Sequence, residues 1–384
     1  MNPRHRSTVR KLLIACGVAC VAGCAHHAAT PAPVPETLPS GAAATPSAAA
    51  RSAVARRVTD ADVRAALYAL ADDSMEGRFT ASPGGARAAR YIAAQMRAIG
   101  LRAAGDSGFF QRVPVSITNG YMPHALESFA AWDTLPADRR GMAVNVVGVL
   151  RGQLADSAIV VDAHYDHLGV VGRGTCRTNS ADSICNGADD DASGAVAVLE
   201  IAKAMAAAPR PRRTIVFVTT TGEEVGLIGT RWYIAHPVVP LSDMMANLEI
   251  EMIDRPDSLA GGPGRAWLTG YDRSTMGEMF AKAGLPIVPD ARPCQGFFER
   301  SDNIAFARAG IPAHTLSTFD LHADYHRVND EVQLANIPHM TAVIRAAAEA
   351  VDILANGPAP HWHEGRKPAP TGRLPLAPGC SARR

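Results

Sequence analysis

Apolar residues recur at two different spacings along the chain, and each spacing predicts a different kind of element. In some segments they lie three or four positions apart, as on one face of a helix, and in others they form short continuous runs, as in strands buried on both faces. The predicted helices run from Thr59 or Asp60 through Leu70 and over 85–99, 195–208, 229–235, 274–283 and 336–354. The predicted strands cover 144–150, 158–163, 214–220, 247–253, 266–269 and 313–317.

From residue 195 onward the predicted helices and strands alternate along the chain. This order is typical of an α/β fold, and we expect a three-layer sandwich in which helices cover both faces of a mixed, largely parallel central sheet. In sheets of this kind, functional residues lie just outside the carboxyl ends of the strands. Candidate chemistry is therefore sought in the residues that follow each strand.

The amino-terminal end has the features of an export signal. Basic residues precede an apolar run over 12–21, which at ten residues is shorter than the roughly 20 needed to span a bilayer. The run ends in Val21-Ala22-Gly23-Cys24, which resembles a bacterial lipobox. We expect Cys24 to carry lipid and to anchor an exported protein to a bacterial membrane, facing the periplasm. The alternative is an ordinary signal peptide that is cut nearby.

Composition divides the rest of the chain into three parts. Residues 24–56 are rich in Ala and Pro and predict a flexible tether after the signal peptide of residues 1–23. Residues 57–356 predict one folded domain, and residues 357–384 predict a Pro-rich tail that is poorly ordered. The interval over 111–143 is too short to hold an additional inserted domain.

Charge and cysteine content narrow the class of protein further. The chain of 384 residues carries 38 Lys and Arg against 37 Asp and Glu, which excludes a strongly basic nucleic-acid binder. Export implies an oxidising compartment, where disulfides persist. Cys176 and Cys185 bracket a short polar loop and predict a local disulfide, and a bridge between Cys294 and Cys380 is a further hypothesis.

Histidines and carboxylates follow the predicted strands repeatedly. They are His164 and Asp166 after the strand 158–163, Asp189, Asp190 and Asp191 before the helix 195–208, Glu223 and Glu224 after 214–220, Glu249, Glu251 and Asp254 in and after 247–253, and His322 and His326 downstream. Like charges gathered at one sheet edge repel each other unless they bind a cation. Imidazole with carboxylate suits zinc, and a shared aspartate suits two ions about 3.5–4 Å apart.

The motifs that carry these residues resemble those of a known family. They read His164-Tyr165-Asp166, Gly187-Ala188-Asp189-Asp190-Asp191-Ala192-Ser193-Gly194, Gly222-Glu223-Glu224-Val225-Gly226-Leu227 and Asp324-Tyr325-His326. They resemble the co-catalytic di-zinc exopeptidases of the clan MH zinc peptidases, and more narrowly the bacterial leucyl aminopeptidase and aminopeptidase Y family. The resemblance extends over about residues 60–355 and includes Met75-Glu76-Gly77-Arg78.

The resemblance implies a role for each matching residue. The implied zinc ligands are His164, Asp190, Glu224, Glu251 and His326, with Asp190 bridging two Zn²⁺ ions. Asp166 is implied to orient the ring of His164, and Glu223 to be the general base that moves a proton from a zinc-activated water to the leaving amine. For Tyr325 the resemblance implies donation to the oxyanion, with simple packing as the alternative.

The fifth ligand and several neighbouring residues leave alternatives open. Glu251-Met252 matches a carboxylate–methionine pair of the family, so Glu251 is favoured over Asp254, and Glu249 is expected to be paired elsewhere or behind the ligands. Asn303 stands where the family has histidine. We expect the other two histidines of this region, His314 and His322, to be structural or exposed in loops.

The resemblance implies a zinc-dependent exopeptidase acting on peptides, most directly an aminopeptidase. A carboxypeptidase or a glutaminyl-cyclase-like acyl transferase on the same metal scaffold is the alternative within enzymes. An inactive, metal-free binding lipoprotein is the alternative of another class, but it predicts degraded ligand positions. Phe297 and Phe298 hint at an apolar side-chain preference. The sequence predicts neither the oligomeric state nor whether the lipid anchor inserts in the inner or the outer membrane.

Overall fold

The computed structural model describes residues 47–178, 180–375 and Cys380. The predicted signal peptide, Cys24 and most of the predicted tether lie outside the described residues. The chain divides into a unit of residues 1–41 and a unit of residues 42–384, and the second unit contains the whole described fold. No helix among the described residues is long and apolar enough to cross a membrane.

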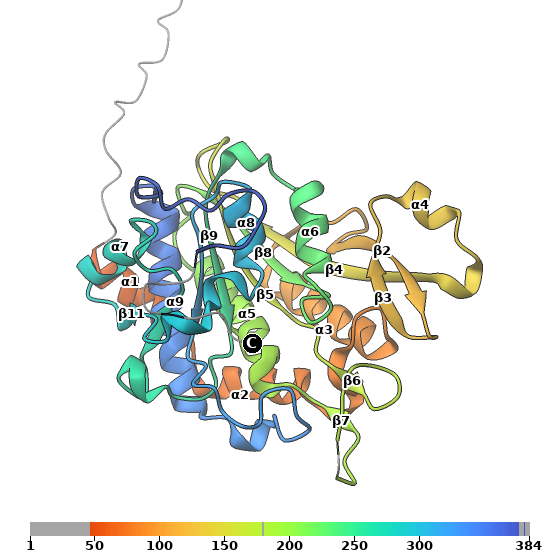
Figure 1. Ribbon diagram of the computed structural model, residues 1–384. Coiled ribbons are helices and arrows are strands. Elements are labelled where there is room, and N and C mark those ends of the chain that lie inside the picture. Colours follow the sequence, from red (N-terminus) through yellow and green to blue (C-terminus); the bar gives the residue numbers. More distant parts are fainter. Residues whose placement is uncertain (1–46, 179, 376–379, 381–384) are drawn as a thin grey trace, which may run out of the picture. The chain divides into compact units, whose positions relative to one another are not determined.

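Within the described part of the chain, ten strands form one mixed sheet (Figure 1). Its spatial order is β11 (Ile287–Pro289), β10 (Ala266–Leu268), β12 (Ala313–Ser317), β9 (Met244–Glu251), β5 (Ala158–His164), β8 (Thr214–Thr220), β4 (Arg140–Leu150), β2 (Phe110–Thr118) and β3 (Met122–Ala125), and β1 (Arg102–Ala103) pairs with β4. The four neighbours β12, β9, β5 and β8 are parallel, whereas β4, β2 and β3 add antiparallel strands at one side. This confirms the α/β fold with a mixed sheet and a parallel centre.

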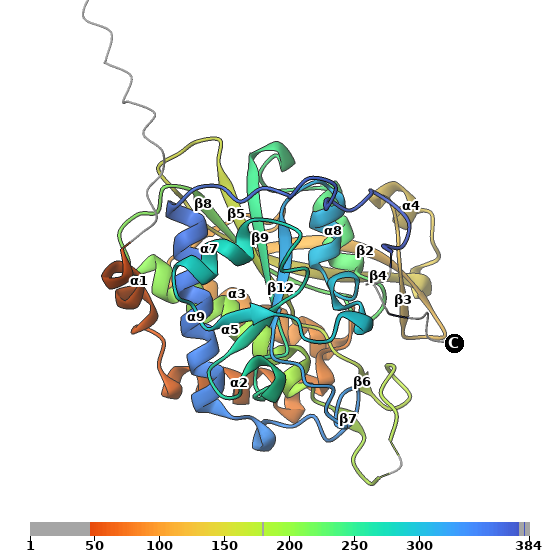
Figure 2. The same ribbon diagram turned by 60° about the vertical axis from the view of Figure 1, so that its left-hand side comes forward.

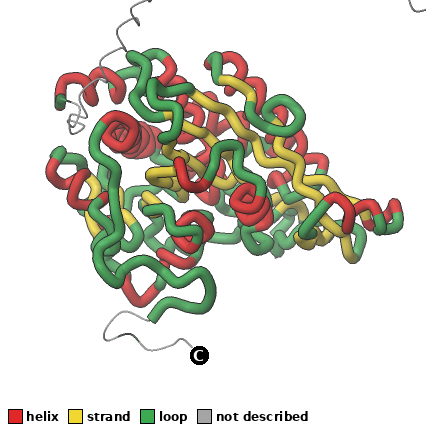
Figure 3. Tube along the Cα trace, turned by 90° about the horizontal axis from the view of Figure 1, so that it is seen from above, coloured by secondary structure: helices red, strands yellow, loops and turns green. Residues whose placement is uncertain are grey.

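Helices cover both faces of the sheet, as Figures 2 and 3 show. On one face lie α2 (Asp60–Leu70), α3 (Pro83–Ile99), α5 (Gly194–Ala206) and α9 (Ile337–Asn356), and on the other lie α6 (Ile228–Ala235) and α8 (Asn303–Arg308). Successive residues of β5 point to opposite faces, so that Ile159 and Val161 join the first core and Val160 joins the second. The shorter helices α4 (Phe129–Asp133) and α7 (Met276–Lys282) lie toward the two ends of the sheet.

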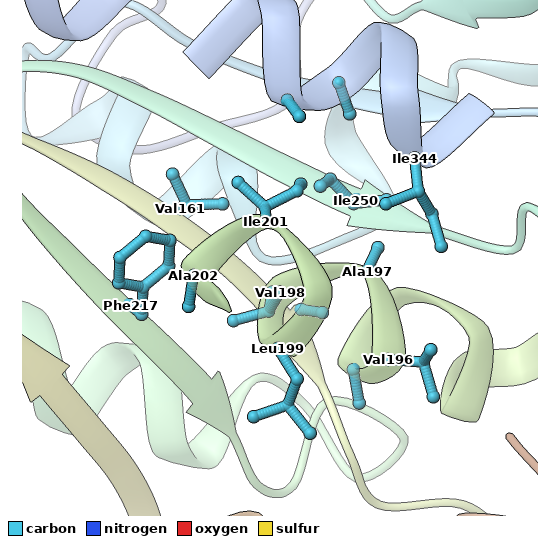
Figure 4. Close-up of a cluster of buried hydrophobic side chains, with 14 of the residues drawn as sticks. Val161, Val196, Ala197, Val198, Leu199, Ile201, Ala202, Phe217, Ile250 and Ile344 are labelled. Carbon is cyan, nitrogen blue, oxygen red and sulfur yellow. The ribbon is translucent and has the colours of Figure 1, made fainter. Parts of the chain in front are cut away.

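Helix α5 is buried on nearly all sides, which explains why its sequence is apolar all round. Figure 4 shows Ile201 and Val198 of this helix among Val161, Phe217 and Ile250 of the sheet. Because α5 is held between the sheet and α9, its first residues cannot shift without disturbing the core. The amino end of α5 is thereby fixed against the ends of the strands.

The last part of the predicted tether is folded. Residues Ala48–Ala55 form helix α1, which Ser47 caps by accepting a hydrogen bond from the backbone of Ala50. Val54 is buried in the same core as α9, and Arg51 donates to the carbonyl oxygen of Ala283 at 3.1 Å. The prediction of a tether over this segment is therefore wrong at its end, because the Ala-rich composition also allows a capped helix with an apolar face.

The segment after α9 also differs from the expected loose tail. The indole nitrogen of Trp362 donates to the carbonyl oxygen of Gly310 at 2.9 Å, and the ring lies 5.7 Å from that of His314. Disulfides join Cys176 to Cys185 and Cys294 to Cys380. The second one ties the end of the chain to the loop that precedes α8, so a proline-rich composition does not here mean a segment without contacts.

Candidate metal centre

Parallel strands bring three of the predicted site residues to one edge of the sheet. His164 is the last residue of β5 and pairs in register with Thr220, the last residue of β8. Glu224 follows four residues after β8 ends, and Glu251 is the last residue of β9. Since the carboxyl ends of parallel strands lie at the same edge, these side chains converge although 87 positions separate the first from the last.

The aspartates come from an irregular turn, Ala188–Ser193, directly before α5. Here Asp190 and Asp191 have non-helical backbone angles and are joined by a cis peptide bond. The carboxylate of Asp191 accepts hydrogen bonds from the backbone of Gly194 at 2.8 Å and of Met252 at 3.1 Å, which fastens the turn to the end of β9. A side chain at Gly194 would collide with the Ile250 carbonyl and the Asp191 carboxylate.

Asp190 lies at the centre of the arrangement. Its Oδ1 lies 3.3 Å from Nε2 of His164, and its Oδ2 lies 3.1 Å from Nε2 of His326. Glu251 approaches the same His164 nitrogen at 3.9 Å, and Glu224 approaches the same His326 nitrogen at 3.2 Å. One carboxylate oxygen of Asp190 therefore faces the pair of His164 and Glu251, and the other faces the pair of His326 and Glu224.

The donor atoms fit divalent cations. His164, Asp190 and Glu251 form one group whose ligand atoms all lie within 4.8 Å of one another, and His167, Asp190 and Glu224 form a second such group. Nε2 of His164 and Oε1 of Glu224 are buried and have no hydrogen-bond partner among the described residues. Buried polar atoms without partners are costly, and a cation would satisfy them. Imidazole nitrogens with carboxylate oxygens suit zinc.

A buried arginine holds the loops that carry these residues. Arg78 is fully buried and donates to the backbone carbonyl oxygens of Tyr165 at 2.7 Å, Asn186 at 2.6 Å and Gly187 at 2.8 Å. Burial lowers the pKa of this guanidinium to about 10, so it remains charged at neutral pH. The Met75-Glu76-Gly77-Arg78 segment therefore joins the loop after β5 to the loop before α5.

The family model for "Peptidase family M28" matches residues 145–351, which is more than half of the chain and includes all the residues of both candidate groups. The chain belongs to peptidase family M28. The protein is therefore a metallopeptidase, and the resemblance found in the motifs is confirmed at the level of the family. This M28 match begins in β4 and ends within α9.

Individual relatives of this M28 peptidase are distant. Leupeptin-inactivating enzyme 1 of Streptomyces exfoliatus is 30% identical over 181 residues, which are 46% of this chain and 39% of that protein. A vacuolar membrane protease of Lachancea thermotolerans is 26% identical over 217 residues, which are 55% of this chain but only 20% of that protein. Among solved structures, a zinc aminopeptidase of Bacillus subtilis has a TM-score of 0.54 and 15% identity, with 77% of this chain and 94% of that chain covered. At that identity the likeness establishes the fold alone.

The M28 peptidase has a buried histidine in its centre that the sequence analysis did not name. His167 is fully buried, and its Nδ1 lies 2.7 Å from Oε1 of Glu224 and 3.8 Å from Oδ2 of Asp190. Nδ1 thus pairs with Glu224 by charge, without the geometry of a hydrogen bond, and Nε2 has no hydrogen-bond partner among the described residues. The sequence did offer a signal for His167, because this residue directly follows the motif His164-Tyr165-Asp166. The predicted motif ended one residue too early.

Asp166 orients the first ligand differently from the expectation. Nδ1 of His164 lies 3.1 Å from the backbone carbonyl oxygen of Asp166 and 3.8 Å from its carboxylate, so the ring donates to the carbonyl. The carboxylate instead accepts from Thr80 at 2.8 Å and from the backbone of Glu223 at 3.2 Å. Burial raises the pKa of Asp166 to about 6, while His164 opposes that rise. Asp166 therefore links the ligand His164 to the segment of Glu223.

The two other acidic candidates of β9 and its end lie outside both groups. Asp254 is buried beside Arg255, with its backbone donating to Asp189 at 2.9 Å, whereas Glu251 lies in the first group. Glu249 accepts hydrogen bonds from the backbones of Asp302 and Asn303 at the start of α8. Glu249 therefore holds a helix end, and its burial raises the pKa of its carboxyl group.

The remaining candidates surround the centre. The ring of Tyr325 stacks on that of His326 with 3.8 Å between centroids, and burial raises its pKa, so the phenol stays protonated. His322 lies 3.0 Å from the Asp189 carboxylate. His314 is buried between Ser274 and Thr269, and Asn303 donates to the carbonyl oxygen of Phe298. Neither His314 nor Asn303 is part of the two candidate metal-ligand groups.

Proposed function

We propose that this M28 peptidase is an aminopeptidase that uses two zinc ions to remove N-terminal residues from peptides. The observation that carries the proposal is the position of Asp190 between two groups of ligand atoms. His164, Asp190 and Glu251 would hold one ion, and Asp190, Glu224 and His326 would hold the other, with His167 beside Glu224. Zinc, when bound, lowers the pKa of a water and polarises a carbonyl group.

Glu223 is the proposed general base. It directly precedes Glu224 but belongs to neither ligand group, so its carboxylate is free to take up a proton and to release it to the leaving amine. Its backbone is fixed by the hydrogen bond to Asp166. Burial raises its pKa well above the ordinary value, the neighbouring Glu224 and Glu251 add to this rise, and His164 opposes it. A raised pKa suits a group that must hold a proton during turnover.

A substrate-end screen on the zinc-loaded protein tests the assignment. We expect release of nitroaniline from aminoacyl-nitroanilides, and no cleavage of peptides whose amino end is acetylated. Cleavage of the acetylated peptides from their carboxyl end would instead identify a carboxypeptidase. Conversion of a glutaminyl peptide into its pyroglutamyl form, without hydrolysis, would identify a cyclase.

We also propose that the protein is exported and anchored through lipid on Cys24. The lipobox pattern supports this, and the two disulfides among the described residues suit an oxidising compartment. Expression with labelled palmitate tests it: the wild-type chain should carry label and fractionate with membranes, whereas Cys24→Ser should carry none. Label retained by Cys24→Ser would overturn the assignment of Cys24.

A further inference from the structure

A narrow cavity opens beside the metal centre, and its walls are largely aromatic. Glu251 and Tyr325 line it at the metal end, and Trp267, Phe297 and Phe319 supply three further rings. The other lining residues are Met252, Thr269, Arg300 and Ser317. These rings come from β10, from the loop before α8 and from the residues after β12, so the cavity forms only in the folded chain. Its position suits the side chain of the substrate residue next to the bond that is cut.

The aromatic walls form one connected set that starts at a candidate ligand. Tyr325 stacks on His326, and its ring centroid lies 4.9 Å from that of Phe319. Phe319 in turn lies 5.8 Å from Phe297, which stacks on Trp267 at 5.1 Å. Because each ring is held by the next, the cavity has a defined shape relative to the metal centre.

One charged hydrogen-bond donor, the exposed guanidinium of Arg300, lines the cavity. The guanidinium of Arg300 lies over the Phe297 ring at 5.0 Å, and Arg300 has no ion pair with any described residue. Trp267 is 2% exposed, and its indole nitrogen is buried without an acceptor in the described part of the chain. Because the indole nitrogen is covered, it offers no contact to a ligand, whereas the guanidinium of Arg300 can pair with a carboxylate and gains nothing from an apolar side chain.

Only one residue of the Phe297-Phe298 pair faces this cavity. The Phe298 ring packs near His314 and Trp362 in the core on the other side, with Arg273 over its face at 4.7 Å. The pair therefore gives no argument for an apolar preference. The guanidinium of Arg300, which has no ion pair with any described residue, becomes the deciding feature of the site.

We propose that this cavity binds a carboxylate of the substrate residue next to the cut bond, with Arg300 as the charged contact. The proposal rests on the proposed peptidase function and adds its substrate class: peptides that begin with Glu or Asp. The same chemistry is offered by the free carboxylate of a peptide's last residue. The substrates below distinguish these two sources.

Kinetics on the zinc-loaded protein test the proposal with glutamyl-, aspartyl-, leucyl- and lysyl-p-nitroanilide. We expect kcat/KM for the glutamyl substrate to exceed that for the leucyl substrate by about tenfold or more, as one charge-assisted hydrogen bond gives. Arg300→Gln should remove most of this ratio through KM and leave the zinc content unchanged. Equal or higher kcat/KM for the leucyl substrate, or a ratio that Arg300→Gln leaves unchanged, would overturn the proposal.

Two further variants sharpen the result. Trp267→Phe keeps an aromatic wall and removes only an N–H that is covered, so it should leave the ratio between the glutamyl and leucyl substrates unchanged. Arg64→Gln is the matched control, because Arg64 lies over the Tyr68 ring at 5.8 Å on the exposed side of α2 and lines no part of the cavity. It should change neither substrate ratio.

A blocked-peptide series separates this proposal from the proposed function. If acetylated peptides that end in Glu are cleaved at the carboxyl end with the same dependence on Arg300, the carboxylate site holds and the aminopeptidase assignment fails. If no substrate is turned over, calorimetry that measures the affinities of free glutamate and free leucine tests the carboxylate site on its own. Glutamate should bind about tenfold more tightly than leucine, and equal affinities would overturn the carboxylate site.

Discussion

The carboxylate of Asp330 holds the backbone of Asp190, the residue shared by both candidate ligand groups. Its two oxygens accept hydrogen bonds from the backbone N–H groups of Asp189 and Asp190, each at 3.0 Å. Arg255 donates to the same Asp330 carboxylate at 3.2 Å and to Asp324 at 2.5 Å, two residues before His326. A single guanidinium therefore connects the turn of the shared aspartate with the loop of the distant histidine.

This connection predicts that Arg255→Lys weakens zinc binding. An ammonium group cannot place two donors in the fixed fork that Asp324 and Asp330 require. We expect zinc affinity to fall by about tenfold to a hundredfold, as measured by competition with a chelator. Arg292→Lys is the control, since Arg292 forms a comparable two-oxygen pair with Asp257 outside the ligand groups. Equal zinc affinity in the two variants would contradict the role of Arg255.

His167→Asn should weaken one of the two zinc sites. Nδ1 of His167 lies 2.7 Å from Glu224 and 3.8 Å from Asp190, so the loss of this ring leaves both carboxylates less well placed. We expect the variant to lose one zinc ion per chain at a chelator concentration about tenfold to a hundredfold lower than the wild type requires. Metal analysis after dialysis against the chelator measures this loss. His339→Asn, at a buried histidine outside the ligand groups, should leave both zinc ions in place.

Replacement of the proposed base should separate chemistry from metal binding. Glu223→Ala and Glu223→Gln should retain about two zinc ions per chain, since Glu223 lies in neither ligand group, and should lose kcat by about a hundredfold to ten-thousandfold. Glu278→Gln, an exposed residue beside His363, is the control and should keep full activity. Substantial turnover in both Glu223 variants would remove the residue from its role.

Acid should destabilise the fold in part through His314. Burial lowers its pKa from 6.5 to about 4, and the neutral ring donates from Nδ1 to the Thr269 carbonyl and accepts from Ser274. Between these pH values the unfolded chain binds a proton that the folded chain excludes, so stability is complete above pH 6.5 and falls as the pH decreases toward 4. The loss attributable to this group is about 3 kcal/mol at most.

Denaturant unfolding of the wild type and of His314→Gln between pH 4 and pH 7 measures this contribution. The variant is expected to be less stable at pH 7 and to show a shallower pH dependence. His124→Gln, at an exposed histidine, should keep the slope of the wild type. Parallel slopes for wild type and His314→Gln would show that His314 does not titrate as its burial implies.

The strand ends explain why the convergence of the candidate ligands could be predicted from the sequence. His164 and Glu251 end strands that the apolar runs already identified, and the parallel order of those strands requires them to meet. His167 was missed because it lies beyond the motif on a loop, where no spacing rule applies. Helix α1 was missed because an Ala-rich composition satisfies the description of a tether and of a short amphipathic helix equally well.

The cavity could not be predicted, because its walls come from segments whose proximity depends on sheet order. Trp267 lies on β10, which is antiparallel to β12, and that reversal brings its ring to Phe297 and Phe319. Nothing in the sequence orders β11, β10 and β12 in space. Nor could the sequence indicate which of the adjacent residues Phe297 and Phe298 faces the cavity.

The disulfide between Cys294 and Cys380 lies in the loop that supplies Phe297 and Arg300, and Glu299 accepts hydrogen bonds from the backbone of Leu374 at 3.1 Å. If the proposed roles hold, catalysis and selectivity depend on different parts of the fold: the candidate ligands lie at the ends of hydrogen-bonded strands, whereas a disulfide holds the loop of the proposed selectivity wall. A chain produced in a reducing cytosol would accordingly hydrolyse peptides while choosing among them less strictly.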